Sequence, residues 1–113
     1  MKREIIWSKD AGDELSEIIL YIKENSGKII AENIYAKIMH KVNDASENAE
    51  GRRIAPLLME VGITDIHQIN INPWIVYYKI ENDTMKIISI IDGRRNLEEI
   101  LHKKIIDGKL TYP

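Results

Sequence analysis

Two apolar stripes with helical spacing, separated by a short stop signal, constrain the fold more than any other feature of the chain. The Asn25-Ser26-Gly27 segment between them is typical of a helix end. Two amphipathic helices joined by so short a turn are expected to form an antiparallel hairpin that buries both stripes against another layer. The stripes comprise Ala11, Leu15, Ile18, Ile19 and Ile22, then Ala31, Ile34, Tyr35, Ile38, Val42 and Ala45.

The pattern changes to that of β-strands after a loop expected over residues 51–62. Apolar and polar residues alternate over residues 69–71, and Asn72-Pro73 is a turn signal. Residues 74–80 are rich in aromatic and β-branched side chains. Residues 85–91 are nearly all apolar, which is typical of a central strand covered on both faces. Three consecutive strands of this kind are expected to form an antiparallel meander.

A short strand at residues 3–7 and a last helix over residues 96–106 complete the expected order, β-α-α-β-β-β-α. The predicted fold class is α+β, with a helical hairpin packed on a mainly antiparallel four-stranded sheet and a C-terminal helix. A chain of 113 residues can bury one core. We therefore expect a single domain over residues 1–108 and a frayed tail at residues 109–113.

Composition excludes several classes of protein. The chain has no cysteine, which excludes disulfides and thiolate chemistry and fits a reducing cytoplasm. Its apolar runs fall far short of the roughly 20 residues that a membrane-spanning helix needs. The net charge of −2 argues against coating nucleic acid through bulk charge, although a local basic patch can still exist. No metal-ligand spacing or phosphate-binding glycine loop is present, so no cofactor is expected.

The pair Arg94-Arg95, directly after the apolar strand, is the strongest candidate for a binding site. Two adjacent guanidinium groups can hold a phosphate or a carboxylate in bidentate fashion. The competing structural role is an ion pair with a helix acid such as Glu98 or Asp13. The pair Arg52-Arg53 in the expected loop is either a second contact with a partner or a solvated loop segment.

Several short motifs keep a fixed order over residues 4–101 and resemble one known family. They are Trp7-Ser8, Ala11, Leu15, Ile18, Tyr21-Ile22, Gly51-Arg52, Pro56, Asp65-Ile66, Pro73-Trp74, Val76-Tyr77-Tyr78 and Ile90 to Leu97. The Gly-Arg-Arg sequence after an apolar strand is the most telling. By these motifs the chain resembles toxins of the RelE/ParE superfamily, and in particular its ParE-like plasmid stabilisation branch. That family has the same β-α-α-β-β-β-α order.

The resemblance implies a toxin of a bacterial type II toxin–antitoxin system. ParE toxins poison DNA gyrase, which is inhibition by binding and requires no catalytic residue. It also implies a cognate antitoxin whose disordered tail folds over the toxin. Trp7, Tyr21 and Trp74 are the aromatic side chains expected at such contacts, beside the two arginine pairs. The sequence leaves open a homodimer or a toxin–antitoxin hetero-oligomer, and the identity of the antitoxin.

The alternative implied by the superfamily is a RelE-like, ribosome-dependent mRNA endoribonuclease. Attack by a 2′-hydroxyl group needs a base, an acid and positive charge near the oxyanion. The candidate catalytic side chains are His67, Tyr77, Lys79, Arg94 and Arg95. A half-exposed structural role competes for His67. Tyr77 and Tyr78 should point to opposite faces, one in the core and the other at or near the surface.

Four positions depart from the pattern of the family. Leu57 stands where a Glu is common, Gln68 also replaces a Glu, Ile75 replaces an Arg, and Asp92 replaces a His. Each replacement removes a charge or a proton-transfer group from the sheet surface. The departures therefore favour binding over RNA cleavage, and they leave a third hypothesis, a decayed, non-toxic homologue that only binds an antitoxin.

Overall fold

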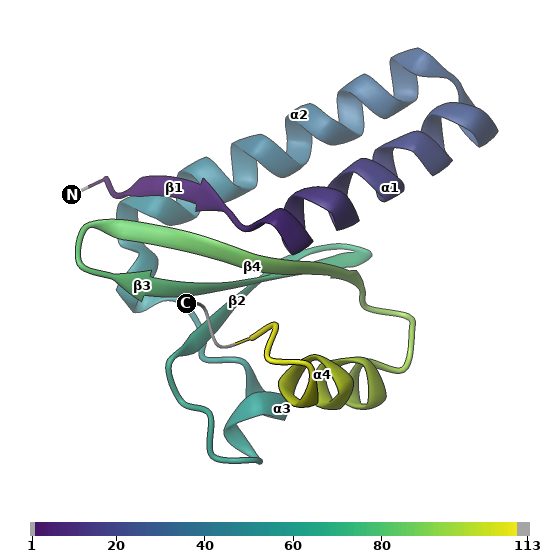
Figure 1. The fold of residues 1–113 in the computed structure, drawn as a ribbon. Helices are drawn as coiled ribbons and strands as arrows, with labels where there is room; N and C mark the ends of the chain where they lie inside the picture. The colour runs from purple at the N-terminus through teal and green to yellow at the C-terminus, as the bar shows by residue number, and fades with distance from the viewer. Residues whose placement is uncertain (1, 111–113) are drawn as a thin grey trace.

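The computed structural model describes residues 2–110, and its elements follow the predicted order (Figure 1). The 3₁₀ helix η1 and the short helix α3 lie where a helix end and a loop were predicted. The elements are β1 (Glu4–Trp7), α1 (Lys9–Ser26), α2 (Lys28–Ala45), η1 (Ser46–Gly51), α3 (Pro56–Met59), β2 (Ile66–Ile71), β3 (Trp74–Glu81), β4 (Thr84–Asp92) and α4 (Leu97–Ile106).

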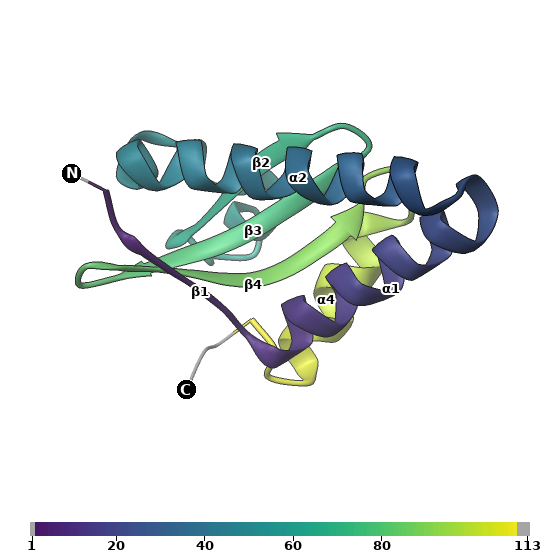
Figure 2. The same ribbon diagram turned by 90° about the horizontal axis from the view of Figure 1, so that it is seen from above.

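The four strands form one mixed sheet in the order β1-β4-β3-β2. The chain from β2 to β4 is the predicted antiparallel meander, and β1 joins β4 in parallel. The apolar strand β4 therefore lies in the interior of the sheet, as predicted. It is buried on both faces because the helical hairpin covers one and α4 the other (Figure 2).

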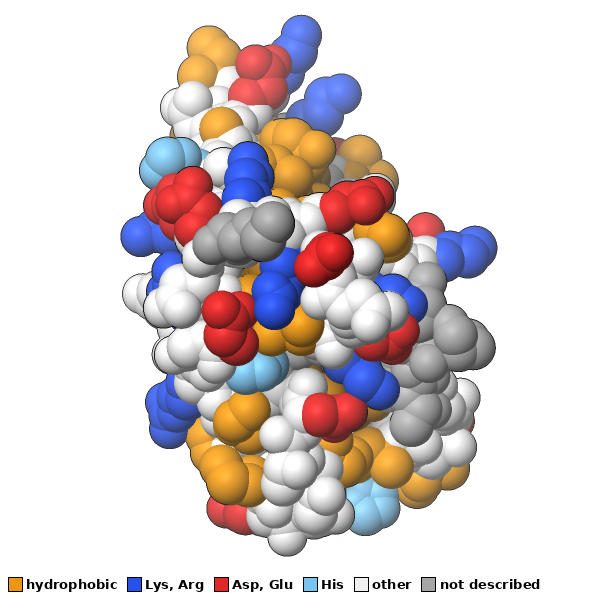
Figure 3. Space-filling model, turned by 90° about the vertical axis from the view of Figure 1, so that its left-hand side faces the viewer, with side chains coloured by type: hydrophobic (Ala, Val, Ile, Leu, Met, Phe, Trp, Pro, Cys, Tyr) orange, Lys and Arg blue, Asp and Glu red, His pale blue; other side chains and the backbone are white. Residues whose placement is uncertain are grey.

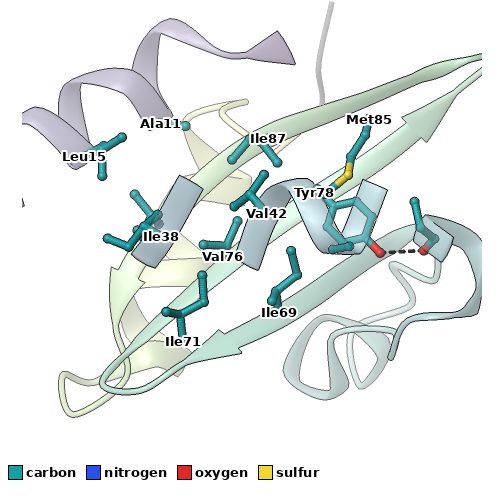
Figure 4. Packing of buried hydrophobic residues seen from close by; sticks show 13 residues of the cluster. Ala11, Leu15, Ile38, Val42, Ile69, Ile71, Val76, Tyr78, Met85 and Ile87 are labelled. Atoms are coloured by element: carbon teal, nitrogen blue, oxygen red, sulfur yellow. Dashed lines mark hydrogen bonds between the residues drawn. The ribbon is translucent and has the colours of Figure 1, made fainter. Parts of the chain in front are cut away.

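The helices α1 and α2 form the predicted hairpin. Ser8 begins α1, because its Oγ accepts a hydrogen bond from the backbone N of Ala11 at 3.0 Å. Gly27 joins the helices with a φ of +96°, a conformation that a side chain disfavours. The inner half of the hairpin packs on the sheet, where Ile38 and Val42 contact the same core as Tyr78 (Figure 4). The far end projects beyond the sheet (Figure 1).

Tyr77 and Tyr78 lie on opposite faces of β3, and both are buried. The expectation that one of them would be at or near the surface is wrong, because α3, α4 and Leu110 cover the second face. A β-bulge separates the two residues in the pairing with β4. Tyr78 donates its hydroxyl hydrogen to the carbonyl of Ala49, which ties β3 to η1 (Figure 4).

Lys109 and Leu110, the first two residues of the predicted tail, pack against the domain. Leu110 is buried beside α4, and Lys109 forms an ion pair with Asp10 at 3.3 Å. The prediction of a frayed end is therefore wrong for these two residues, because Leu110 completes the core under α4. The rest of that prediction, residues 111–113, lies outside the described residues.

Candidate functional site

The predicted arginine pair lies at one end of a groove of about 420 Å³ between α1 and the end of β4. Gly93 brings the chain to this position, because its N donates to the carbonyl of Pro73 at 2.7 Å. A Cβ atom on Gly93 would lie 3.0 Å from that carbonyl oxygen. The groove is lined by Glu14, Glu17, Ile18, Tyr21, Ile22, Trp74, Ile90, Ile91, Asp92, Arg94 and Arg95.

Arg94 is held by Asp92, two residues before it. Its Nε lies 3.0 Å from Oδ1 of Asp92 and its Nη2 lies 2.6 Å from Oδ2, a bidentate pair. The backbone N of Arg94 donates to the same Oδ1 at 2.9 Å. These bonds to Arg94 lower the pKa of Asp92 to about 2. Arg94 therefore pairs with a carboxylate, as the competing structural role required, but the partner is neither Glu98 nor Asp13.

Arg95 is exposed and makes no ion pair within residues 2–110. Asp92 accepts its side-chain hydrogen bonds from Arg94 alone among the residues that the structure describes. The two adjacent arginines are thus unequal. The charge of Arg94 is largely neutralised, whereas that of Arg95 is available to a carboxylate or phosphate of a partner.

Two of the three aromatic residues expected at a partner contact share this groove. Tyr21 is 67% exposed on α1, and Trp74 is half-buried at the start of β3. Trp7 is half-buried and packs against the core under the helical hairpin instead. The structure therefore brings Tyr21 and Trp74 together with Arg94 and Arg95. The carboxylates of Glu14, Glu17 and Asp92 line the same groove, so it is an aromatic surface with charges of both signs, which suits a protein partner.

A partly buried ion network fixes the wall of the groove. Oε1 of Glu14 accepts hydrogen bonds from Oγ of Ser89 at 2.9 Å and from the backbone N of Ile90 at 3.2 Å. Lys104 of α4 lies 2.9 Å from Oε2 of Glu14 and 2.7 Å from Oδ2 of Asp10. The network joins α1 to β4 and α4, two elements that lie far from α1 in the sequence.

The pKa shifts follow from this network. Burial favours the neutral form of Lys104, but its bonds to Asp10 and Glu14 outweigh burial and raise its pKa. Burial likewise opposes the charged form of Asp10, yet Lys104 and Lys109 hold its pKa below the usual value. Sequence reasoning did not single out Glu14 or Lys104, because both look like ordinary helix-surface charges.

The remaining candidate catalytic side chains are engaged in structural contacts away from the groove. His67 is buried, so the expected half-exposed setting is wrong. Its Nδ1–H donates to the carbonyl of Arg52 at 2.9 Å, and its ring stacks on Tyr78 with centroids 5.1 Å apart. Tyr77 lies in the core under α4, where burial raises its pKa to about 12. Lys79 pairs with Asp65 at 3.3 Å.

The four departures from the family pattern are also accounted for. Leu57 and Ile75 pack against the core under α4, so apolar contact replaces the missing charges. Gln68 donates from Nε2 to Oδ1 of Asn70 at 3.1 Å. Asp92 neutralises Arg94. Each of the four side chains therefore makes a contact within the folded chain.

Arg52 and Arg53 line a different concavity beside the edge strand β2, and no residue lines both sites. Within residues 2–110, no group of three or more His, Asp or Glu side chains is placed to hold a metal ion. Across the same residues, no helix combines the length and the apolar character needed to span a bilayer.

The family model described as "ParE toxin of type II toxin-antitoxin system, parDE" matches residues 5–97. A solved structure, "Chromosomal ParDE TA system from P. aeruginosa", has the same fold with a TM-score of 0.67 and 14% sequence identity; the match covers 80% of this chain and 95% of that one. No curated protein matches the sequence. Because the family model spans most of the chain, the chain belongs to the ParE toxin family of type II toxin–antitoxin systems, as the sequence motifs indicated.

Proposed function

We propose that this ParE-family toxin acts in the cytoplasm by binding and inhibiting DNA gyrase, and that a cognate antitoxin neutralises it. The observation that carries the proposal is the groove between α1 and β4. It combines a cation without an ion-pair partner in the described residues, Arg95, with the exposed ring of Tyr21 and the half-buried ring of Trp74. Aromatic side chains and arginine are the usual anchors of protein interfaces.

The settings of the candidate catalytic side chains favour inhibition over RNA cleavage. A general base must reach a proton of the substrate. His67 is buried, with its ring stacked on Tyr78 and Nδ1–H bonded to a carbonyl. Tyr77 is buried on the other face of the sheet, and its raised pKa disfavours proton loss. The candidate acid and base groups thus do not converge on Arg95.

The antitoxin is proposed to cover the same groove, so that gyrase and antitoxin exclude each other. An antitoxin tail with an apolar residue between the rings of Tyr21 and Trp74 and an acidic residue against Arg95 would match this surface. Such a tail would order on binding, which suits a disordered segment. A toxin–antitoxin hetero-oligomer follows from this proposal.

The test is a supercoiling assay with purified gyrase and relaxed plasmid, beside an mRNA integrity assay in a translation reaction. We expect the wild-type chain to stop supercoiling and to leave mRNA intact. The Arg94→Ala/Arg95→Ala variant should lose most of the inhibition while its melting temperature changes little, because both side chains are exposed. Fragmented mRNA with normal supercoiling would instead establish the endoribonuclease alternative. If the chain affects neither process, it is a non-toxic homologue that only binds an antitoxin.

A further inference from the structure

A second concavity, of about 370 Å³, lies between α2 and the open edge of β2. We propose that it binds the phosphate backbone of a nucleic-acid duplex. Its polar lining consists of Lys41, Asp44, Arg52, Arg53, Gln68 and Asn70. The proposal is independent of gyrase inhibition, because it concerns other residues and a direct contact between this chain and nucleic acid.

The concavity has a net positive charge. Lys41, Arg52 and Arg53 contribute three positive charges and Asp44 one negative charge, which leaves a net charge of +2. None of the three cations has an ion pair within residues 2–110, whereas Asp44 lies 3.4 Å from Nε2 of His40. Acidic and basic side chains are interspersed on the face of the molecule drawn in Figure 3. The local cluster is therefore the feature that can attract an anion.

The loop that carries the two arginines is fixed by its main chain. The carbonyl of Arg53 accepts from the N of Gln68 at 2.9 Å, and the N of Ala55 donates to the carbonyl of Ile66 at 2.8 Å. The carbonyl of Arg52 accepts from Nδ1 of His67 at 2.9 Å. The backbone is thus held against β2 while the guanidinium groups stay exposed, so little ordering of the loop is needed on binding.

Neutral donors stand beside the cations. Gln68 uses one N–H of its amide to reach Oδ1 of Asn70, which leaves its second N–H and the Nδ2 of Asn70 as further donors. The backbone N–H of Gln68 points away from β3, toward the carbonyl of Arg53. Backbone N–H groups of an edge strand point to alternate sides, so the backbone N–H of Asn70, two residues later, points to the same open edge. Arginine, side-chain amides and backbone N–H groups are the usual contacts to phosphate oxygens.

The lining also indicates which kind of ligand fits. Ile69 is the one apolar side chain of the lining and is buried, so an acidic peptide would find no apolar pocket for an anchor. No aromatic side chain lines the concavity, and single strands are normally held by stacking of bases on aromatic rings. Contacts to the backbone of a duplex need neither feature. The expected recognition is therefore independent of base sequence.

The experiment is fluorescence anisotropy of a short labelled DNA duplex with the purified full chain, from about 50 to 200 mM salt. Arg52→Ala/Arg53→Ala should weaken binding at least tenfold and reduce the slope of log K against log salt by about 2. This variant should keep its fold, because residues 52 and 53 bond to the rest of the domain through their main-chain carbonyls, which alanine retains. The charge-matched control is Lys23→Ala/Lys103→Ala, two exposed lysines on α1 and α4, which should bind as the wild type does.

Competitors test the class of ligand. Unlabelled duplex RNA should displace the probe as duplex DNA does, whereas single-stranded RNA, inorganic phosphate and a polyglutamate peptide should require far higher concentrations. The proposal is overturned if the arginine variant binds as tightly as the wild type, or if the lysine control loses as much affinity. It is also overturned if polyglutamate or single-stranded RNA competes more strongly than the duplex. Gyrase is absent throughout, so the outcome is separate from that of the supercoiling assay.

Discussion

The two arginine pairs look alike in the sequence but have different settings in the structure. Arg94-Arg95 stands beside a groove that apolar, aromatic and charged side chains line, and Asp92 neutralises its first member. Arg52-Arg53 stands beside a polar concavity, and neither member has an ion pair in the described part of the chain. The first setting suits a protein partner and the second suits phosphate groups.

The difference depends on one neighbour of each pair. Each pair has an acid two residues before its first arginine, Asp92 in one case and Glu50 in the other. Asp92 folds back onto Arg94, whereas Glu50 lies 3.3 Å from Arg3 near β1. An acid at the same spacing therefore neutralises one arginine of the first pair but neither arginine of the second, because Glu50 pairs with Arg3 instead.

The groove and the concavity also differ in the contacts that hold their residues in place. The groove depends on side chains, because Glu14 and Lys104 join α1, β4 and α4. The concavity depends on main-chain bonds between the loop and β2. Substitutions of side chains should therefore damage the first region more than the second.

The largest effect is expected from Lys104→Ala, which breaks the support of the groove. Glu14 would lose its cation and Asp10 would keep only Lys109, both in a partly buried place, which should lower the free energy of unfolding by about 2–3 kcal/mol. Urea unfolding measures this change. The neighbouring Lys103→Ala, on the exposed side of α4, should have almost no effect. Equal stability of both variants would show that the network contributes nothing.

The next effect separates the two members of the first pair. Arg95→Ala should raise the concentration of toxin that halves gyrase activity about tenfold, because its charge is free to pair with the partner. Arg94→Ala should raise it less, because Asp92 already neutralises that charge. Supercoiling titrations of the two variants make the comparison. If Arg94→Ala loses more inhibition than Arg95→Ala, the partner must displace Asp92 from Arg94.

Asp92→Asn should leave Arg94-Arg95 without a carboxylate partner, as Arg52-Arg53 already is within the described residues. The charge of Arg94 is then released toward the groove, and binding of an acidic antitoxin peptide should tighten a few-fold. The melting temperature should fall by no more than about 4 °C, because surface ion pairs stabilise weakly. Calorimetric titration and thermal unfolding measure the two quantities. Weaker binding of the peptide would show that Asp92 itself is needed in the contact.

The smallest effect is the acid dependence of this ion pair. The pKa of Asp92 is about 2 in the folded chain, below the value of about 3.9 in unfolded chains. Its contribution to stability is therefore present above about pH 4 and is lost as the pH falls through about 2. The stability difference between wild type and Asp92→Asn should shrink over that range. A constant difference would contradict the assigned pairing.

Local patterns predicted most of the fold. The helical stripes defined the hairpin, and the apolar run of residues 85–91 identified the interior strand. The burial of Tyr77 and His67 was not predicted, because it depends on α4 and on the loop that pairs with β2, both of which are long-range contacts. Periodicity gives the face on which a residue lies but not what covers that face.

The candidate site was predicted in part. Arg94 and Arg95 were selected because they follow an apolar strand, and the structure places them in a groove with Tyr21 and Trp74. The role of Lys104 could not be read from the sequence, because its partners Glu14 and Asp10 lie at least ninety positions away. The unequal roles of the two arginines depend on the conformation of the turn at Asp92.

The proposed function is tested most directly by the supercoiling activity of purified gyrase, titrated with the purified chain and with both double arginine variants. Inhibition by the wild type is expected, with a loss of most inhibition in Arg94→Ala/Arg95→Ala and no loss in Arg52→Ala/Arg53→Ala. Supercoiling that continues unchanged at saturating wild-type toxin would contradict the proposed function. Equal inhibition by the wild type and Arg94→Ala/Arg95→Ala would contradict the role of the groove.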